Sequence, residues 1–148
     1  MKKSMYFIIG VVMVAILILG YNYNKYATKD FQQTLSMNPN KITTIKIENP
    51  TGENDDFIST TDKDKIEELV NYLNKFEFKR KSTDAIDAKD LYPNMDVNTS
   101  TLMLYQNDKV NIITPVGKEI MINEKAFTVV NGEIDFTFIM DFYKSIKK

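Results

Sequence analysis

Residues 101–130 read TLMLYQNDKVNIITPVGKEIMINEKAFTVV, and their pattern indicates the architecture of the domain. Four short runs of apolar and β-branched residues follow one another here, and turn-forming residues separate them. The runs are Thr101 to Gln106, Val110 to Thr114, Glu119 to Ile122 and Ala126 to Val130. The turn signals are Asn107-Asp108, Pro115-Val116-Gly117 and Asn123-Glu124. Short runs joined by such tight turns predict an antiparallel meander of four strands.

One face of this meander is expected to pack against helices. Successive side chains of a strand point to opposite faces of its sheet, so the apolar positions of each run indicate the buried face. The helix-facing residues that we predict are Leu102, Leu104, Val110, Ile112, Ile120 and Ile122.

The residues before the meander contain the most regular helical pattern of the chain. Residues 60–76 read TTDKDKIEELVNYLNKF, in which Thr60-Thr61-Asp62 offers N-cap oxygens. Apolar residues then recur at the spacing of an amphipathic helix. They are Ile66, Leu69, Val70, Leu73 and Phe76. We interpret Lys79-Arg80-Lys81 as cations at the C-terminal end of this helix, with contact to an anionic envelope polymer or lipid headgroups as the alternative.

Further strands and a final helix complete the predicted fold. Lys41 to Glu48 (KITTIKIE) and Phe57 to Thr60 (FIST) are predicted as strands, and residues 82–98 as a long loop. Residues 134–146 (IDFTFIMDFYKSI) alternate like a strand at their start, but Asp135 as N-cap favours a helix. The predicted class is α+β: an antiparallel sheet with the element order β-β-α-β-β-β-β-α and helices on one face, preceded by one N-terminal transmembrane helix.

The N-terminal residues have the composition of a membrane anchor. Met5 to Leu19 (MYFIIGVVMVAILIL) contains no charged side chain, and Gly20 and Tyr21 extend it toward the length that spans a hydrocarbon core about 30 Å thick. Lys2 and Lys3 precede it and predict a cytoplasmic N-terminus. The residues expected to anchor the chain are Met5, Phe7, Ile8, Ile9, Val11, Val12, Ile16, Leu17, Ile18 and Leu19.

A cleaved signal peptide is the alternative to this uncleaved signal-anchor. Cleavage requires a pair of small residues shortly after the apolar run, and no suitable pair follows it. We therefore predict a single-pass protein of the cell membrane with an extracellular C-terminal domain. The expected units are residues 1–26, a cytoplasmic stub and transmembrane signal-anchor; 27–40, a polar stalk; and 41–148, an extracytoplasmic α+β domain.

The composition of the chain excludes several kinds of chemistry. Its 148 residues include no Cys, no His and no Trp. Without Cys and His there is no disulfide, no Ser-His-Asp or Cys-His catalysis, and no ordinary zinc, copper or haem site. From Ala27 onward there are 16 basic and 20 acidic side chains, a net charge of −4 that does not support nucleic-acid binding. We predict that the protein is not an enzyme and has no catalytic residues and no cofactor.

Two acidic clusters are the remaining candidates for a site. Glu53, Asp55 and Asp56 are a candidate Ca²⁺ site, but the ligand spacing of an EF-hand is absent and a solvated hairpin tip explains the same residues. Three aspartates of the predicted loop are the candidate carboxylates of an envelope hydrolase, although such a loop does not bury a carboxyl enough to raise its pKa. They are Asp84, Asp87 and Asp90.

Three structural segments carry a resemblance to other proteins. They are the opening strand KITTIKIENPTG, the step TTDKDKIEELVNYLNK into a helix, and the run TLMLYQNDKVNIITP that continues into strands. Over residues 41–146 the chain resembles an uncharacterised family of small membrane-tethered or lipoprotein-type extracytoplasmic α+β domains of low-GC Gram-positive bacteria. The usage of 18 Lys against one Arg, with 17 Ile and 14 Asn, is typical of such genomes. The resemblance implies a tethered domain and transfers no catalytic or binding residue.

These observations predict a binding protein held at a membrane. We expect a membrane-anchored extracytoplasmic interaction module, whose partners are the membrane, through the N-terminal helix, and a protein of the envelope. An immunity or accessory protein for a toxin or transporter is one alternative. A carboxylate-dependent envelope hydrolase is the alternative from a different class.

Overall fold

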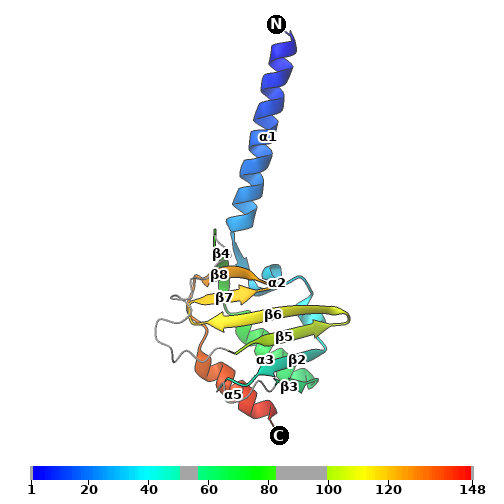
Figure 1. Cartoon of the computed structure of the whole chain (residues 1–148), viewed down its shortest axis with the longest axis vertical. Helices are drawn as coiled ribbons and strands as arrows, with labels where there is room; N and C mark the ends of the chain where they lie inside the picture. Colours follow the sequence, from blue (N-terminus) through cyan, green and yellow to red (C-terminus); the bar gives the residue numbers. More distant parts are fainter. Residues whose placement is uncertain (1, 51–56, 83–99, 148) are drawn as a thin grey trace.

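The computed structural model describes residues 2–50, 57–82 and 100–147 (Figure 1). Its elements are α1 (Lys2–Tyr26), β1 (Thr28–Asp30), α2 (Phe31–Thr34), η1 (Pro39–Lys41), β2 (Thr44–Glu48), β3 (Phe57–Thr60), α3 (Lys63–Leu73), β4 (Glu77–Arg80), β5 (Leu102–Gln106), β6 (Lys109–Val116), β7 (Glu119–Ile122), β8 (Lys125–Val129) and α5 (Phe136–Ile146). The strands form one sheet in the order β1-β4-β8-β7-β6-β5-β2-β3. All neighbouring strands are antiparallel, which confirms the predicted α+β class.

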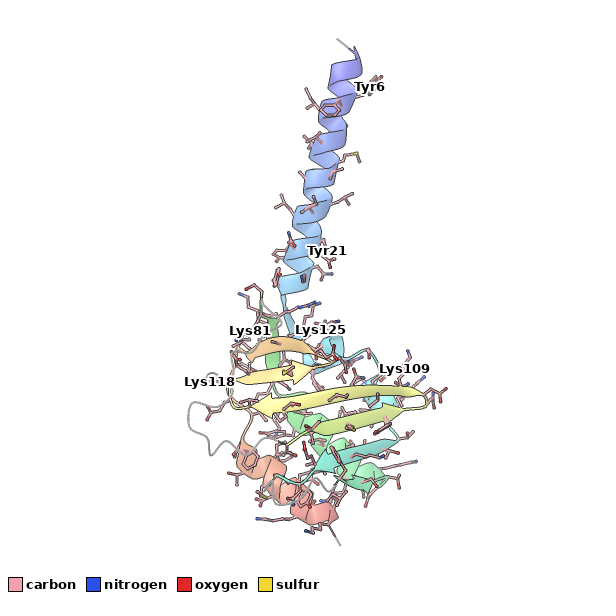
Figure 2. All side chains as sticks on the ribbon, viewed as in Figure 1. Tyr6, Tyr21, Lys81, Lys109, Lys118 and Lys125 are labelled. Carbon is pink, nitrogen blue, oxygen red and sulfur yellow. The ribbon has the colours of Figure 1, made fainter. Side chains whose placement is uncertain are left out.

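Helix α1 projects from the sheet as an apolar rod. Within the described residues it is the one helix long and apolar enough to cross a membrane, over Tyr6–Tyr26. Its side chains point outward along its length (Figure 2), and Phe7 and Leu17 are among the most exposed apolar residues of the protein. Apolar surface of this extent is stable in lipid rather than in water. The chain thus contains the predicted helix that is able to span a membrane.

The residues after α1 belong to the folded domain, which differs from the stalk expected over residues 27–40. Strand β1 begins at Thr28 and pairs with β4. Helix α2 begins at Phe31, whose side chain is completely buried. The Asp30 carboxylate accepts a hydrogen bond from Gln33 N at 2.7 Å and so caps this short helix. Phe31 and Met37 are among the few apolar residues of this polar segment, and both are buried in the core.

Residues 77–80 form strand β4, so the interpretation of Lys79-Arg80-Lys81 as a helix end is wrong. Helix α3 ends at Leu73 with Asn74 as its C-cap. Phe78 then faces the core, where its ring lies 6.2 Å from that of Phe31. Strands β1 and β4 are the two that the predicted element order lacks. Each has at most four residues, which is too short to display a clear period of two.

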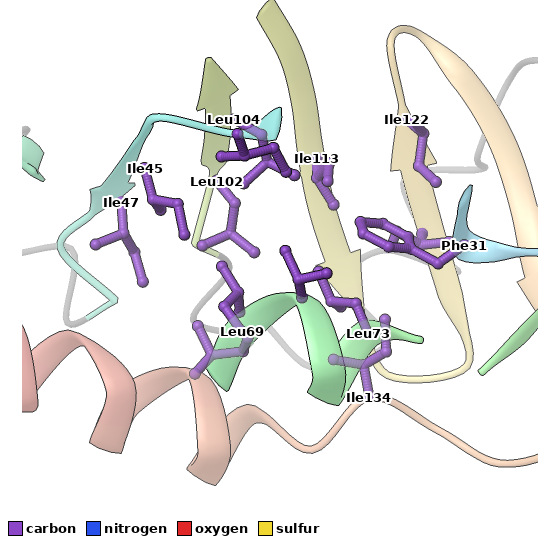
Figure 3. Close-up of a cluster of buried hydrophobic side chains, with 14 of the residues drawn as sticks. Phe31, Ile45, Ile47, Leu69, Leu73, Leu102, Leu104, Ile113, Ile122 and Ile134 are labelled. Atoms are coloured by element: carbon purple, nitrogen blue, oxygen red, sulfur yellow. The ribbon is translucent and has the colours of Figure 1, made fainter. Parts of the chain in front are cut away.

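The inner face of the sheet packs on the helices, as predicted (Figure 3). Helix α3 buries four residues of the predicted apolar stripe: Ile66, Leu69, Val70 and Leu73. The strands contribute Ile45, Ile47, Phe78, Leu102, Leu104, Ile113, Ile120, Ile122, Phe127 and Val129. Helix α5 adds Ile139, Phe142 and Tyr143 to the same cluster. A single core therefore lies between one face of the sheet and the two longer helices of the domain.

Strand β6 presents the opposite face from the one that we predicted. Val110 and Ile112 were expected in the core, but they are 41% and 44% exposed. Asn111 and Ile113 are fully buried in their place. A one-residue change of register turns every side chain of a strand to the other face.

The two-residue turn before β6 explains this register. Because Asn107-Asp108 alone connects β5 to β6, Gln106 pairs with Lys109. Counting back along both strands, Leu102 then lies opposite Ile113, and Leu104 lies opposite Asn111. Residues directly opposite each other share a face, so the buried leucines take the odd-numbered residues of β6 inward. Pro115, expected in a turn, is an inward residue of β6 for the same reason.

Residues 136–146 are helical, which confirms the favoured interpretation of this segment. Asp135 is the N-cap, and its carboxylate accepts a hydrogen bond from Thr137 N at 2.8 Å. The ring of Tyr72 on α3 stacks on Phe138, and its hydroxyl accepts a hydrogen bond from Asp135 N. Burial raises the pKa of Tyr72, so its hydroxyl stays protonated to a higher pH than that of a free tyrosine. These contacts join α5 to α3.

Candidate interaction surface

The outer face of the sheet, opposite the helices, carries an apolar group that we call the outer strip. It consists of Met103, Tyr105, Val110, Ile112 and Met121. Met103 lies directly opposite Ile112, and Tyr105 lies opposite Val110, so side chains of β5 and β6 form one continuous group. Met121 extends this group onto β7. The two β6 residues are exposed, and the other three are half-buried.

Charged side chains border the outer strip on two sides. On β2, Lys46 places its Nζ 5.3 Å from the centre of the Tyr105 ring, a cation–π contact. Toward β8, Lys81 Nζ lies 2.6 Å from Glu119 Oε1, and both side chains are largely shielded from solvent. Protein interfaces commonly combine a centre rich in methionine and aromatic residues with a polar rim.

The outer strip is mainly apolar and rests on a regular part of the sheet. Its one titratable side chain is Tyr105, and the Tyr105 hydroxyl lies 3.4 Å from Met103 Sδ as a donor. Methionine side chains adapt their shape to a partner and pack well against aromatic rings. The backbone beneath them is held by the ladders of β5, β6 and β7. A partner that covers this surface removes apolar area from water without any rearrangement of the sheet.

The position of the outer strip in the sheet separates it from the end of α1. Strand β1 directly follows α1, and the strand order places β6 fifth and β5 sixth when counted from β1. At about 4.8 Å between strands, the strip extends from about 14 Å from β1, at Met121 on β7, to about 24 Å, at β5. Figure 1 shows the same arrangement, with the strands stacked one after another away from the end of α1.

The structure brings together some of the predicted site residues and does not describe others. The predicted anchor residues from Phe7 to Leu19, together with Met5, all belong to α1. The candidate metal ligands Glu53, Asp55 and Asp56 lie outside the described residues. The same holds for the three candidate hydrolase carboxylates, Asp84, Asp87 and Asp90. Within the described parts of the chain, no three acidic side chains gather in a way that would hold a metal ion.

Comparison with known proteins adds no family to this description. No protein-family model, curated protein or solved structure matches the chain.

The outer strip was missed from the sequence because Val110 and Ile112 were assigned to the core. The signal that reveals it is the length of the turn at Asn107-Asp108, which sets the pairing of β5 with β6.

Proposed function

We propose that this protein is a membrane-anchored extracytoplasmic interaction module whose outer strip binds a protein of the envelope. The observation that supports this proposal most directly is the exposure of Val110 and Ile112, near the turn of the β5–β6 hairpin, on a sheet face that no helix covers in the described structure. Selection for solubility does not favour two such residues side by side, whereas a binding surface requires them.

A protein fits this surface better than lipid or glycan. The strip is about 14–24 Å from β1 by strand count, beyond a headgroup layer about 5–7 Å thick at the end of α1. The chain contains no Trp, the residue that most often forms a platform for sugars. An immunity or accessory role for a toxin or transporter uses the same surface, and the identity of the partner decides between these roles.

Site-specific crosslinking in intact cells tests the partner proposal. A photoreactive amino acid in place of Ile112 is expected to capture one envelope protein reproducibly. The same amino acid at Lys144, whose side chain is exposed on α5, is the matched control and is expected to capture none. Adding Met103→Lys to the Ile112 probe should reduce capture at least about tenfold, because a charge in an apolar interface removes binding energy of more than about 1.4 kcal/mol. Equal capture from both probe positions, or unchanged capture with Met103→Lys, would contradict the proposal.

The proposed topology has a test of its own, which the absence of native cysteine makes clean. We expect Ser145→Cys, on the exposed side of α5, to react with a membrane-impermeant maleimide in intact cells. Ser4→Cys should react only after permeabilisation, because the two preceding lysines hold the N-terminus in the cytoplasm. Both full-length proteins should stay in the pellet after carbonate extraction. Recovery of a shortened chain in the medium would favour the cleaved signal peptide instead.

A further inference from the structure

A basic pocket lies where α1 meets the first strands of the sheet. Its volume is about 250 Å³. Four cations line it, one from each of α1, β1, β4 and β8: Lys25, Lys29, Arg80 and Lys125. Among the residues that the structure describes, those that line the pocket include no acidic side chain. Figure 2 shows Lys125 just below the end of α1.

Strand pairing brings these cations together. Lys29 lies opposite Phe78, and Arg80 lies opposite Phe127, so both cations are on the inner face of the sheet. Lys125 precedes Phe127 by two residues and therefore shares that face. The three cations of the sheet therefore lie on one face of it, beside the end of α1.

The length of α1 places this pocket at the surface of the membrane. The 21 residues of Tyr6–Tyr26 are about 32 Å long at 1.5 Å per residue, which matches a hydrocarbon core of about 30 Å. Lys25 then lies at the boundary of the hydrocarbon core. Helix α1 ends at Tyr26, and β1 begins at Thr28. The headgroup layer adds about 5–7 Å on each side of the core. The pocket therefore lies at the depth of the headgroups, with Tyr21 and Asn24 of α1 forming its membrane-side wall.

We propose that this pocket binds the phosphate headgroup of an anionic phospholipid in the adjoining leaflet. The ammonium groups of Lys29 and Lys125 are suited to hydrogen bonds with phosphate oxygens, and Lys25 and Arg80 add positive charge to the same pocket. The acyl chains of that lipid run along the apolar surface of α1. A bound lipid joins α1 to β1, β4 and β8 and holds the sheet at a defined orientation to the membrane. The lipid proposal requires that α1 crosses the membrane, but it does not depend on the outer strip. Failure of the lipid proposal therefore leaves the partner proposal intact.

Native mass spectrometry of the full chain, released from nanodiscs of mixed phosphatidylglycerol and phosphatidylcholine, tests this site. We expect the protein to retain phosphatidylglycerol in preference to phosphatidylcholine. The double variant Lys29→Gln/Lys125→Gln should lower that preference about tenfold or more, whereas Lys109→Gln/Lys118→Gln should leave it unchanged. The control removes the same charge from two exposed lysines at turns of the sheet away from α1, labelled in Figure 2.

Four results would overturn the proposal. The first is equal retention of both lipids by the unaltered chain. The second is an equal loss of preference in the two double variants, because the preference for phosphatidylglycerol would then depend on net charge alone and not on the pocket. The third is that soluble glycerol phosphate binds the chain in pure phosphatidylcholine nanodiscs and displaces phosphatidylglycerol from mixed ones, since the pocket would then serve a free phosphate. The fourth is that Lys29→Gln/Lys125→Gln keeps the preference for phosphatidylglycerol. Circular dichroism of that variant verifies its fold.

Discussion

Phe31→Ala is expected to lower the free energy of unfolding of the domain by about 3–5 kcal/mol. The Phe31 side chain has no exposed surface, and its ring packs against that of Phe78 at the end of the core near α1. Truncation removes the transfer free energy of the ring and leaves a cavity that β1 and α2 are too short to fill. Urea unfolding of the full chain in detergent micelles, followed by near-ultraviolet circular dichroism of its tyrosines and phenylalanines, measures this change.

Phe57→Ala is the matched control, because Phe57 lies on β3 with 42% of its surface exposed. We expect this substitution to cost less than about 1 kcal/mol, as surface changes commonly do. A similar small cost for Phe31→Ala would mean that residues 27–40 form a stalk outside the cooperative unit. A large difference between the two variants would instead place the start of the folded domain immediately after α1.

The stalk interpretation failed for a physical reason. A single phenylalanine between polar residues gives no periodic pattern, and a strand of three residues is shorter than one repeat of any reliable signal. Strand β1 forms because it pairs with β4, and β4 forms because it pairs with both β1 and β8, which lies far along the chain. Tertiary pairing, rather than local preference, determines these two strands.

The elements with strong local signals were predicted correctly. Helix α3 combines an N-cap with an apolar stripe, and Asp62 accepts the expected capping hydrogen bond from Asp64 N. The cap at Asp135 likewise resolved the choice between strand and helix for α5. The four runs of the meander all became strands. Caps and periodic stripes act over one or two turns of chain, so a sequence reveals them without knowledge of the partner element.

Both candidate surfaces depend on register, which is why sequence patterns did not define them. The outer strip requires Val110 and Ile112 to face away from the helices, and β6 has apolar residues in both alternating sets. The basic cluster Lys79-Arg80-Lys81 is divided by the alternation of β4. Arg80 lines the pocket beside α1, whereas Lys81 pairs with Glu119. The alternative interpretation of this cluster, contact with lipid headgroups, is thus retained, as a proposal, for Arg80.

Asn111→Ala is expected to lower the free energy of unfolding by about 2–3 kcal/mol. Asn111 is fully buried on the inner face of β6. Its Oδ1 accepts hydrogen bonds from Ser36 N at 3.2 Å, from Ser36 Oγ at 2.9 Å and from Asn123 Nδ2. Asn123 in turn accepts a hydrogen bond from Ile112 N at its own Oδ1. Removing the Asn111 amide leaves three donors without their acceptor, and that loss outweighs one ordinary hydrogen bond.

Asn71→Ala, at an exposed position of α3, is the control for the same chemical change and is expected to be neutral or slightly stabilising because alanine favours a helix. Ser36→Ala should fall between the two, since it removes one donor and leaves the Asn123 contact intact. If Asn111→Ala were as mild as Asn71→Ala, the connection between residues 35–38 and β6 would contribute nothing to stability. We expect the loss in free energy of unfolding to decrease in the order Asn111→Ala, Ser36→Ala, Asn71→Ala. That order would mean that the buried amide of Asn111 holds the chain after α2 against the sheet. This contact keeps Phe31 in the core and preserves the shape of the pocket beside α1.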